Sequence, residues 1–90
     1  MLDPNSLEFI KQCARDFDFK AVWLFGSASR DEADYRDIDL AVEGIDTKKF
    51  YAFYGRLFMG LPKPVDLVDF SENLPIVSLI RESGKIIYER

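Results

Sequence analysis

Four short apolar runs constrain the architecture that this chain can adopt. They cover residues 20–25, 38–42, 65–70 and 85–88, and a glycine or proline stands close to one end of each run. Apolar runs of this length, bounded by such turn residues, are typical of buried strands. The link between the first two runs is too short to require a parallel crossover. The pattern therefore predicts a mixed β-sheet.

Segments with helical spacing of apolar residues lie before and between these runs. Asp3 and Pro4 predict a helix start, because the carboxylate can accept from free amide groups and proline fits the first turn. Further helices are expected over residues 46–60 and 73–84. The order α-β-β-α-β-α-β predicts an α/β fold (α+β), with helices packed on the mixed sheet. We expect residues 1–90 to form one domain.

Two details of these helices bear on packing. The second helix carries more aromatic residues than one core face needs, so Tyr51 or its neighbours are expected at a partner interface. Lys48 and Lys49 are expected in a solvated first turn. In the third helix, Ile76, Leu79 and Ile80 share one apolar face.

The charge balance excludes some classes of partner. Twelve Lys and Arg against sixteen Asp and Glu give a net charge of −4. This sign opposes extended binding to DNA or RNA, which depends on basic residues that displace counterions. No apolar run approaches the roughly 18 residues of a membrane span, and residues 1–4 do not resemble a secretion signal. We therefore expect a cytoplasmic protein that binds no membrane.

Histidine is absent, and Cys13 is the single cysteine. The common zinc sites and histidine-based catalytic schemes are therefore excluded. Cys13 has no predicted basic neighbour and is expected to be a small apolar residue, buried or half-buried. Catalysis would have to use carboxylates, hydroxyls, Lys or Arg, with or without a hard metal ion.

Gly26 and Ser27 directly follow the first predicted strand. A glycine there lets backbone amide groups approach a ligand closely, and free N–H groups at a helix start attract anions such as phosphate. The alternative is a plain turn. The polar residues 28–36 that follow are expected to form a solvated loop or a short helix.

Aspartates interrupt two of the apolar runs. Asp37 and Asp39 are expected on one face, because side chains alternate along a strand. Two like charges there cost stability unless a cation lies between them, and Mg²⁺ prefers carboxylate oxygens. The alternative is an exposed strand edge whose acids have no role.

Asp66 lies in the third run and would face Asp37 and Asp39 if the two strands are neighbours. Three carboxylates could then surround one or two metal ions and support an in-line displacement without histidine. Asp69 alternates to the opposite face and is not expected to be a ligand.

The combination of Gly26-Ser27, nine intervening residues, Asp37-x-Asp39 and a later Asp66 resembles the nucleotidyltransferase superfamily of DNA polymerase beta. More closely, the chain is similar to the minimal, stand-alone nucleotidyltransferases (MNT). These occur in prokaryotic toxin–antitoxin pairs beside a HEPN-domain protein. The resemblance covers nearly the whole chain, from the first helix to the closing segment 82–88.

The resemblance implies roles for the residues that match. Gly26 and Ser27 would bind the phosphates of a nucleotide, and Arg30 would neutralise the triphosphate. Two positions depart from the family pattern. Asp31 stands where glycine is frequent and Arg36 where serine is frequent, which puts the details of substrate binding in question.

Metal binding and catalysis follow from the same resemblance. Asp37 and Asp39 would hold Mg²⁺, and Asp66 would complete the catalytic site and help to activate the attacking hydroxyl. The implied reaction transfers AMP from ATP to a protein hydroxyl. The implied acceptor is a tyrosine of a cognate HEPN ribonuclease toxin, which would make the chain an antitoxin.

Two other functions stay open. The chain could neutralise a toxin by occlusion, with its acidic surface facing a basic partner. It could also bind Mg·ATP as a sensor without turnover. A homodimer and a hetero-oligomer are both compatible with the sequence.

Overall fold

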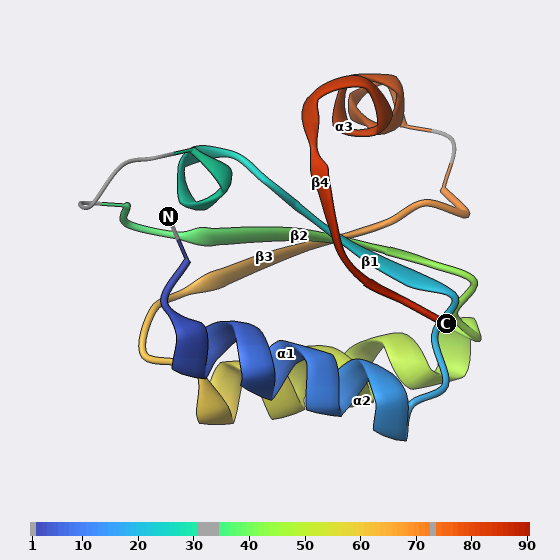
Figure 1. Cartoon of the computed structure of the whole chain (residues 1–90). Coiled ribbons are helices and arrows are strands. Elements are labelled where there is room, and N and C mark those ends of the chain that lie inside the picture. The colour runs from blue at the N-terminus through green and yellow to red at the C-terminus, as the bar shows by residue number, and fades with distance from the viewer. Residues whose placement is uncertain (1, 31–34, 73) are drawn as a thin grey trace.

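The computed structural model describes residues 2–30, 35–72 and 74–90. Its elements follow in the predicted order (Figure 1): α1 (Pro4–Asp16), β1 (Ala21–Phe25), the 3₁₀ turn η1 (Ser27–Ser29), β2 (Ile38–Glu43), α2 (Thr47–Gly60), β3 (Val65–Asp69), α3 (Ile76–Ser83) and β4 (Lys85–Glu89). No helix in these ranges is long and apolar enough to cross a membrane.

The strands form one mixed sheet in the order β3-β2-β1-β4. β1 runs antiparallel to both β2 and β4, whereas β2 and β3 are parallel. A parallel pair needs a long crossover, and α2 supplies it. In Figure 1, α1 and α2 lie on one face of the sheet and α3 lies on the other. The predicted mixed sheet with packed helices is therefore confirmed.

α1 starts at the predicted cap. Asp3 accepts hydrogen bonds from the backbone N–H of Ser6 at 2.9 Å and from its hydroxyl at 2.8 Å, and Pro4 occupies the first turn. The hydroxyl of Tyr35 also donates to Asp3 at 3.4 Å. These bonds, led by the one from the Ser6 backbone, lower the pKa of Asp3. The cap thereby joins the start of α1 to the segment that leads into β2.

α2 is fixed at both ends by local chemistry. Asp46 caps it by accepting from the backbone N–H of Lys48 at 2.9 Å. The helix ends at Gly60, as predicted, and Leu61 continues in an extended conformation. A Cβ atom at Gly60 would overlap the ring of Phe9 on α1. The glycine therefore also lets the two helices pack closely.

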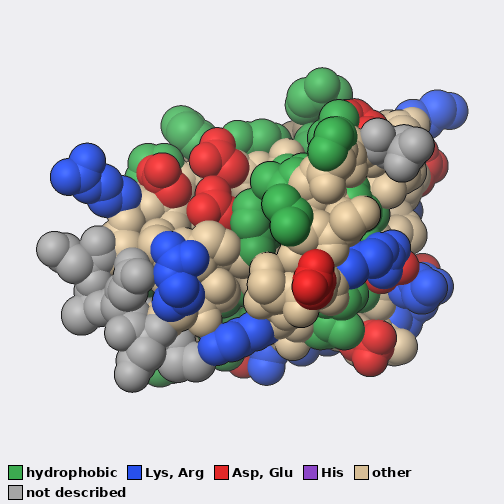
Figure 2. All heavy atoms as spheres, turned by 90° about the horizontal axis from the view of Figure 1, so that it is seen from above, with side chains coloured by type: hydrophobic (Ala, Val, Ile, Leu, Met, Phe, Trp, Pro, Cys, Tyr) green, Lys and Arg blue, Asp and Glu red, His purple; other side chains and the backbone are tan. Residues whose placement is uncertain are grey.

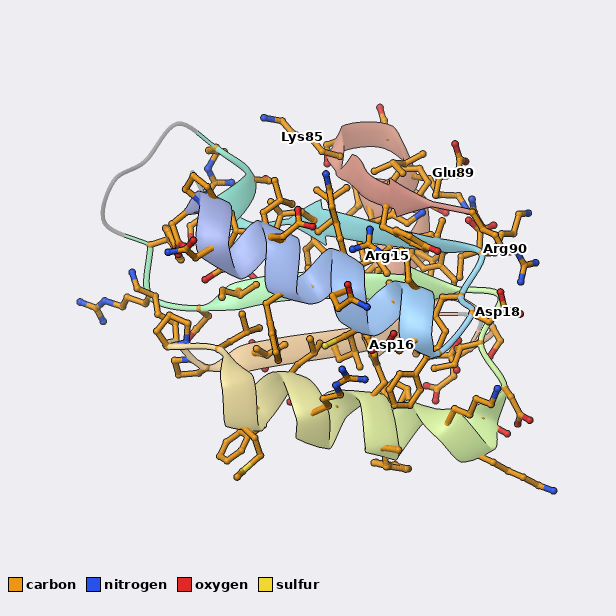
Figure 3. All side chains as sticks on the ribbon, turned by 60° about the horizontal axis from the view of Figure 1, so that its bottom comes forward. Arg15, Asp16, Asp18, Lys85, Glu89 and Arg90 are labelled. Atoms are coloured by element: carbon orange, nitrogen blue, oxygen red, sulfur yellow. The ribbon has the colours of Figure 1, made fainter. Side chains whose placement is uncertain are left out.

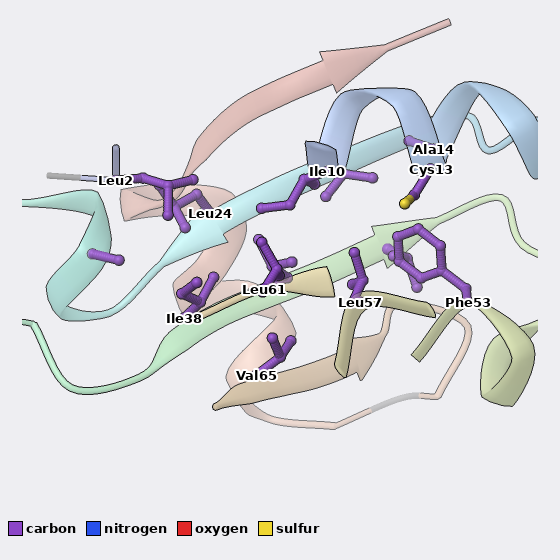
Figure 4. Close-up of a cluster of buried hydrophobic side chains, with 14 of the residues drawn as sticks. Leu2, Ile10, Cys13, Ala14, Leu24, Ile38, Phe53, Leu57, Leu61 and Val65 are labelled. Carbon is purple, nitrogen blue, oxygen red and sulfur yellow. The ribbon is translucent and has the colours of Figure 1, made fainter. Parts of the chain in front are cut away.

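The main core lies between the sheet and the pair α1 and α2 (Figure 4). Phe53 of α2 is fully buried, and its ring centroid lies 4.4 Å from that of Phe19 and 5.6 Å from that of Phe17. Cys13 is fully buried in the same core, as predicted, and burial raises the pKa of its thiol. This residue therefore acts as a packing residue.

The apolar residues expected on one face of α3 are not equally buried. Ile80 is buried, whereas Leu79 is 62% exposed. The helix is short, so few of its side chains can reach the sheet. A second attachment comes from Arg81, whose guanidinium carbon lies 4.6 Å from the Phe70 ring centroid and whose Nη2 lies 3.2 Å from Glu43.

The buried position of Phe53 gives a stability prediction. Phe53→Ala should lower the free energy of unfolding by about 3–5 kcal/mol, because it removes apolar contacts and leaves a cavity between α2 and the sheet. Phe58→Ala on the same helix is the matched control, since that side chain is 68% exposed. Urea unfolding followed by circular dichroism measures both. Equal losses in the two variants would contradict the assigned burial.

Candidate active site

Asp39 and Asp66 are brought together by the parallel pairing of β2 and β3. The two residues are direct partners in the register, as are Leu40 and Leu67. Leu40 points into the core, so Asp39 faces the opposite side of the sheet, on which α3 lies. Figure 2 looks onto that side and shows acidic side chains gathered beside hydrophobic ones. Asp39 is half-buried and Asp66 is exposed.

Asp37 lies just before β2 and is exposed. Its charge acts on Asp39 and raises the pKa of that residue, although burial and Asp66 have larger effects. Among the described residues, no three acidic or cysteine side chains form a ready-made metal cluster. The structure therefore pairs Asp39 with Asp66 and leaves Asp37 at their margin.

Gly26 stands against this pair of carboxylates. It follows Phe25, which is the register partner of Asp39 on β1, and has a positive φ of 70°. A Cβ atom at this position would overlap Oδ2 of Asp39. Only glycine combines this backbone conformation with so close an approach to the carboxylate. The closeness of Asp39 therefore requires glycine at the start of this turn.

The turn η1 carries the other residues predicted to bind a nucleotide. The hydroxyl and the backbone N–H of Ser29 both donate to the Gly26 carbonyl, at 2.7 Å and 3.1 Å. The backbone N–H of Arg30 donates to the Ser27 carbonyl at 3.1 Å. Ser27 is half-buried and Arg30 is exposed at the end of the turn. Ser29, which the sequence analysis did not single out, thus holds the turn closed beside Asp39.

The electrostatics of Asp39 are unfavourable without a cation. Burial raises the pKa of its carboxyl, and the negative charges of Asp66 and Asp37 raise it further. A half-buried acid with two acidic neighbours holds its proton more strongly than an isolated one. A positive charge between these oxygens would remove the repulsion.

These carboxylates fit a hard divalent cation. All three donors are carboxylate groups, the kind that Mg²⁺ prefers, and Gly26 keeps the space against Asp39 free of a side chain. Asp39 and Asp66 would be the first ligands, with Asp37 joining them from the segment before β2.

Lys63 is a further residue of this region that the sequence analysis did not single out. Its Nζ donates to the backbone carbonyl of Tyr35 at 2.5 Å and lies 3.7 Å from the centroid of the Tyr35 ring. Tyr35 precedes Asp37 by two residues, and Lys63 precedes Asp66 by three. This contact therefore joins the segments that carry the two aspartates. The only sequence signal was the rigid Pro62-Lys63-Pro64 turn.

The structure describes two of the remaining candidates. Asp69 is buried at 5% exposure and accepts from the backbone N–H of Ser71 at 2.9 Å, consistent with its exclusion as a ligand. Arg36 is exposed. Asp31 lies outside the described residues.

The sequence matches the family model described as "Polymerase beta, Nucleotidyltransferase" over residues 8–90. No curated protein matches it significantly.

Solved structures of two toxin–antitoxin complexes are similar to the whole chain. One is the toxin–antitoxin MntA-HepT, with a TM-score of 0.74 and 22% identity, over 98% of this chain and 74% of that chain. The other is a toxin–antitoxin with AMP-PNP, with a TM-score of 0.74 and 25% identity, over 99% of this chain and 75% of that chain. At 22% identity, the similarity to the MntA-HepT structure shows a shared fold and nothing more.

The raised pKa of Asp39 gives a prediction about stability. In EDTA at neutral pH, Asp39→Asn should raise the thermal midpoint, because it removes a half-buried, repelled charge. The carboxyl binds a proton more tightly in the folded chain than in the unfolded chain, so its effect on stability becomes less favourable as the pH rises above the ordinary value of 3.8.

The gain should therefore shrink as the pH is lowered toward that value. Thermal unfolding at several pH values measures it, with the exposed Asp18→Asn as the control. A lower midpoint for Asp39→Asn at neutral pH would contradict the prediction.

The contact between Lys63 and Tyr35 gives a prediction about metal binding. Lys63→Met keeps the aliphatic stem but removes the ammonium group, so the segment that carries Asp37 loses its tie to β3. Mg²⁺ affinity should fall roughly tenfold, as is usual when a group that orients a ligand is removed. Calorimetric titration with Mg²⁺ measures it, and the exposed Lys85→Met serves as the control. Equal affinity in both variants would exclude a positioning role for Lys63.

Proposed function

Because the chain belongs to the polymerase beta nucleotidyltransferase family, we propose that it transfers AMP from ATP to a hydroxyl group of a partner protein. The observation that carries this proposal is the register pair of Asp39 and Asp66, with Gly26 packed against one of the two carboxylates. The proposal treats residues 1–90 as one nucleotidyltransferase domain that works with one or two Mg²⁺ ions.

The proposed transfer exchanges one P–O bond for another. The acceptor oxygen forms a bond to the α-phosphorus of ATP, the bond to the oxygen bridging to the β-phosphate breaks, and pyrophosphate leaves. Asp66, which is exposed at the surface, would accept the proton of the acceptor hydroxyl. Bound Mg²⁺ would neutralise the phosphate oxygens and lower the pKa of the hydroxyl.

Each remaining site residue has a role in holding the substrate. Asp37 and Asp39 would bind the metal with Asp66. The half-buried Ser27 and the backbone of Gly26 would bind phosphate oxygens, and Arg30 at the end of η1 would offset the charge of the triphosphate. The turn lies next to the acidic pair, so the phosphates and the metal ligands would be adjacent.

The partner that we propose is a toxin with a HEPN domain, and its acceptor is a tyrosine hydroxyl. The similar structures are of toxin–antitoxin complexes, and one of them contains AMP-PNP, an analogue of ATP. This chain covers about three quarters of each of those chains. The chain would thus act as an antitoxin by modifying its toxin covalently.

A second candidate function is antitoxin activity by occlusion, without transfer. The observation in its favour is that α2 leaves large apolar side chains exposed, at Tyr51, Phe58 and Met59, which could bind a toxin without any transfer. Binding of the toxin would then suffice, and the acidic residues would serve electrostatic complementarity.

Transfer of label from α-phosphate-labelled ATP distinguishes these functions. The wild type, Asp39→Asn and the control Asp18→Asn are each mixed with Mg²⁺ and the protein encoded beside this chain. We expect label on that protein with the wild type and the control, and a loss of at least about 100-fold with Asp39→Asn. Mass mapping then identifies the acceptor residue. A stable complex that never becomes labelled would favour occlusion.

A further inference from the structure

The outer face of α2 combines large exposed apolar side chains with a local excess of positive charge. Tyr51 is 80% exposed, Phe58 68% and Met59 84%. Their spacing places them on one side of the helix, opposite the buried residues Phe53 and Leu57. Figure 3 views the molecule from the helical side and shows side chains of α2 that project away from the sheet.

Gly55 lies among these side chains, and a Cβ atom there would meet nothing within 4 Å. Its place in the sequence, four residues after Tyr51 and three before Phe58, puts it on the same face. The helix backbone is therefore uncovered between these large apolar side chains. The backbone of a second helix can approach closely at such a point.

The charge of α2 differs in sign from that of the whole chain. It contains three of the twelve basic residues and none of the sixteen acidic ones. Arg56 is already paired, since its Nη2 lies 2.7 Å from Asp16 at the end of α1. Lys48 and Lys49 form no ion pair with any residue in the described ranges.

The two lysines also occupy an unfavourable place on the helix. They lie in the first turn, near the positive end of the helix dipole, where added cations weaken the helix and the capping Asp46 supplies one opposing charge. An acidic group bound next to them would remove this cost. The positive charge thus indicates a ligand with negative charge near the lysines. The exposed apolar side chains beside them indicate that the same ligand is also apolar.

We propose that this α2 face, made of Lys48, Tyr51, Gly55, Phe58 and Met59 with Lys49 beside it in the first turn, binds an amphipathic helix of the partner protein that carries Asp or Glu at one end of its apolar side. A second copy of the chain fits less well through the same face, because Thr47–Gly60 contains no acidic residue and Asp46 before it already caps the helix. Long nucleic acids and anionic membranes would face repulsion from the acidic remainder of the chain.

This inference rests on the proposed pairing with a toxin, but it does not depend on AMP transfer. Figure 1 shows α2 and α3 on opposite faces of the sheet, and the acidic pair lies on the α3 side because Leu40, next to Asp39, faces the core. The partner would therefore be held by one side of the molecule and modified at the other. Loss of binding and loss of transfer can be separated by experiment.

Binding of the protein encoded beside this chain, measured by calorimetric titration, tests the proposal. Phe58→Ser should weaken binding about tenfold or more, as expected for an apolar contact at the centre of an interface. Leu79→Ser is the control, because Leu79 is similarly exposed but lies on α3 across the sheet, and it should weaken binding less than Phe58→Ser does. The pair Lys48→Glu and Lys49→Glu should also weaken binding, and its effect should decrease at high salt.

Mg·ATP binding should be unchanged in Phe58→Ser, which separates this surface from the acidic pair. Wild-type affinity in both Phe58→Ser and the double lysine variant would overturn the proposal, as would the absence of any complex with the wild type. Analytical ultracentrifugation of the chain alone tests whether a second copy of the chain occupies the α2 face. A dimer that Phe58→Ser dissociates would assign the α2 face to a second copy instead.

Discussion

The parallel pairing of β2 with β3 determines where the candidate active site lies. It sets Asp39 directly beside Asp66, although 26 residues separate them in the sequence. That pairing depends on the crossover through α2, which packs on the sheet through Phe53 and Leu57. A buried apolar contact on one face of the sheet thus holds two carboxylates next to each other on the opposite face.

The acidic pair is costly to the folded chain when no metal is bound. Asp39 is half-buried, and its neighbours raise its pKa, so its charge opposes folding at neutral pH. Gly26 adds a second constraint, because its backbone conformation and its closeness to Asp39 both exclude a side chain. Chains that need only to fold have no reason to keep either feature, and together they are the strongest local support for a metal-dependent function.

Most of the fold was predictable because it is encoded locally. Caps such as Asp3, apolar runs and glycines gave the element order, and the motif of Gly26, Asp37, Asp39 and Asp66 gave a family that the family model confirms. Contacts between distant segments were not predictable. Nothing in the sequence indicates that Lys63 would donate to the carbonyl of Tyr35, 28 residues earlier, because any of several exposed lysines could have done so.

The alternation of side chains along β2 has a consequence for how such a chain can vary. Ile38, Leu40 and Val42 face the core, and Asp39 lies between them on the other side. A single-residue insertion or deletion within the strand would turn its apolar set outward and its carboxylate into the core, and so damage folding and function at once. The length of β2 is thus constrained along with its buried residues.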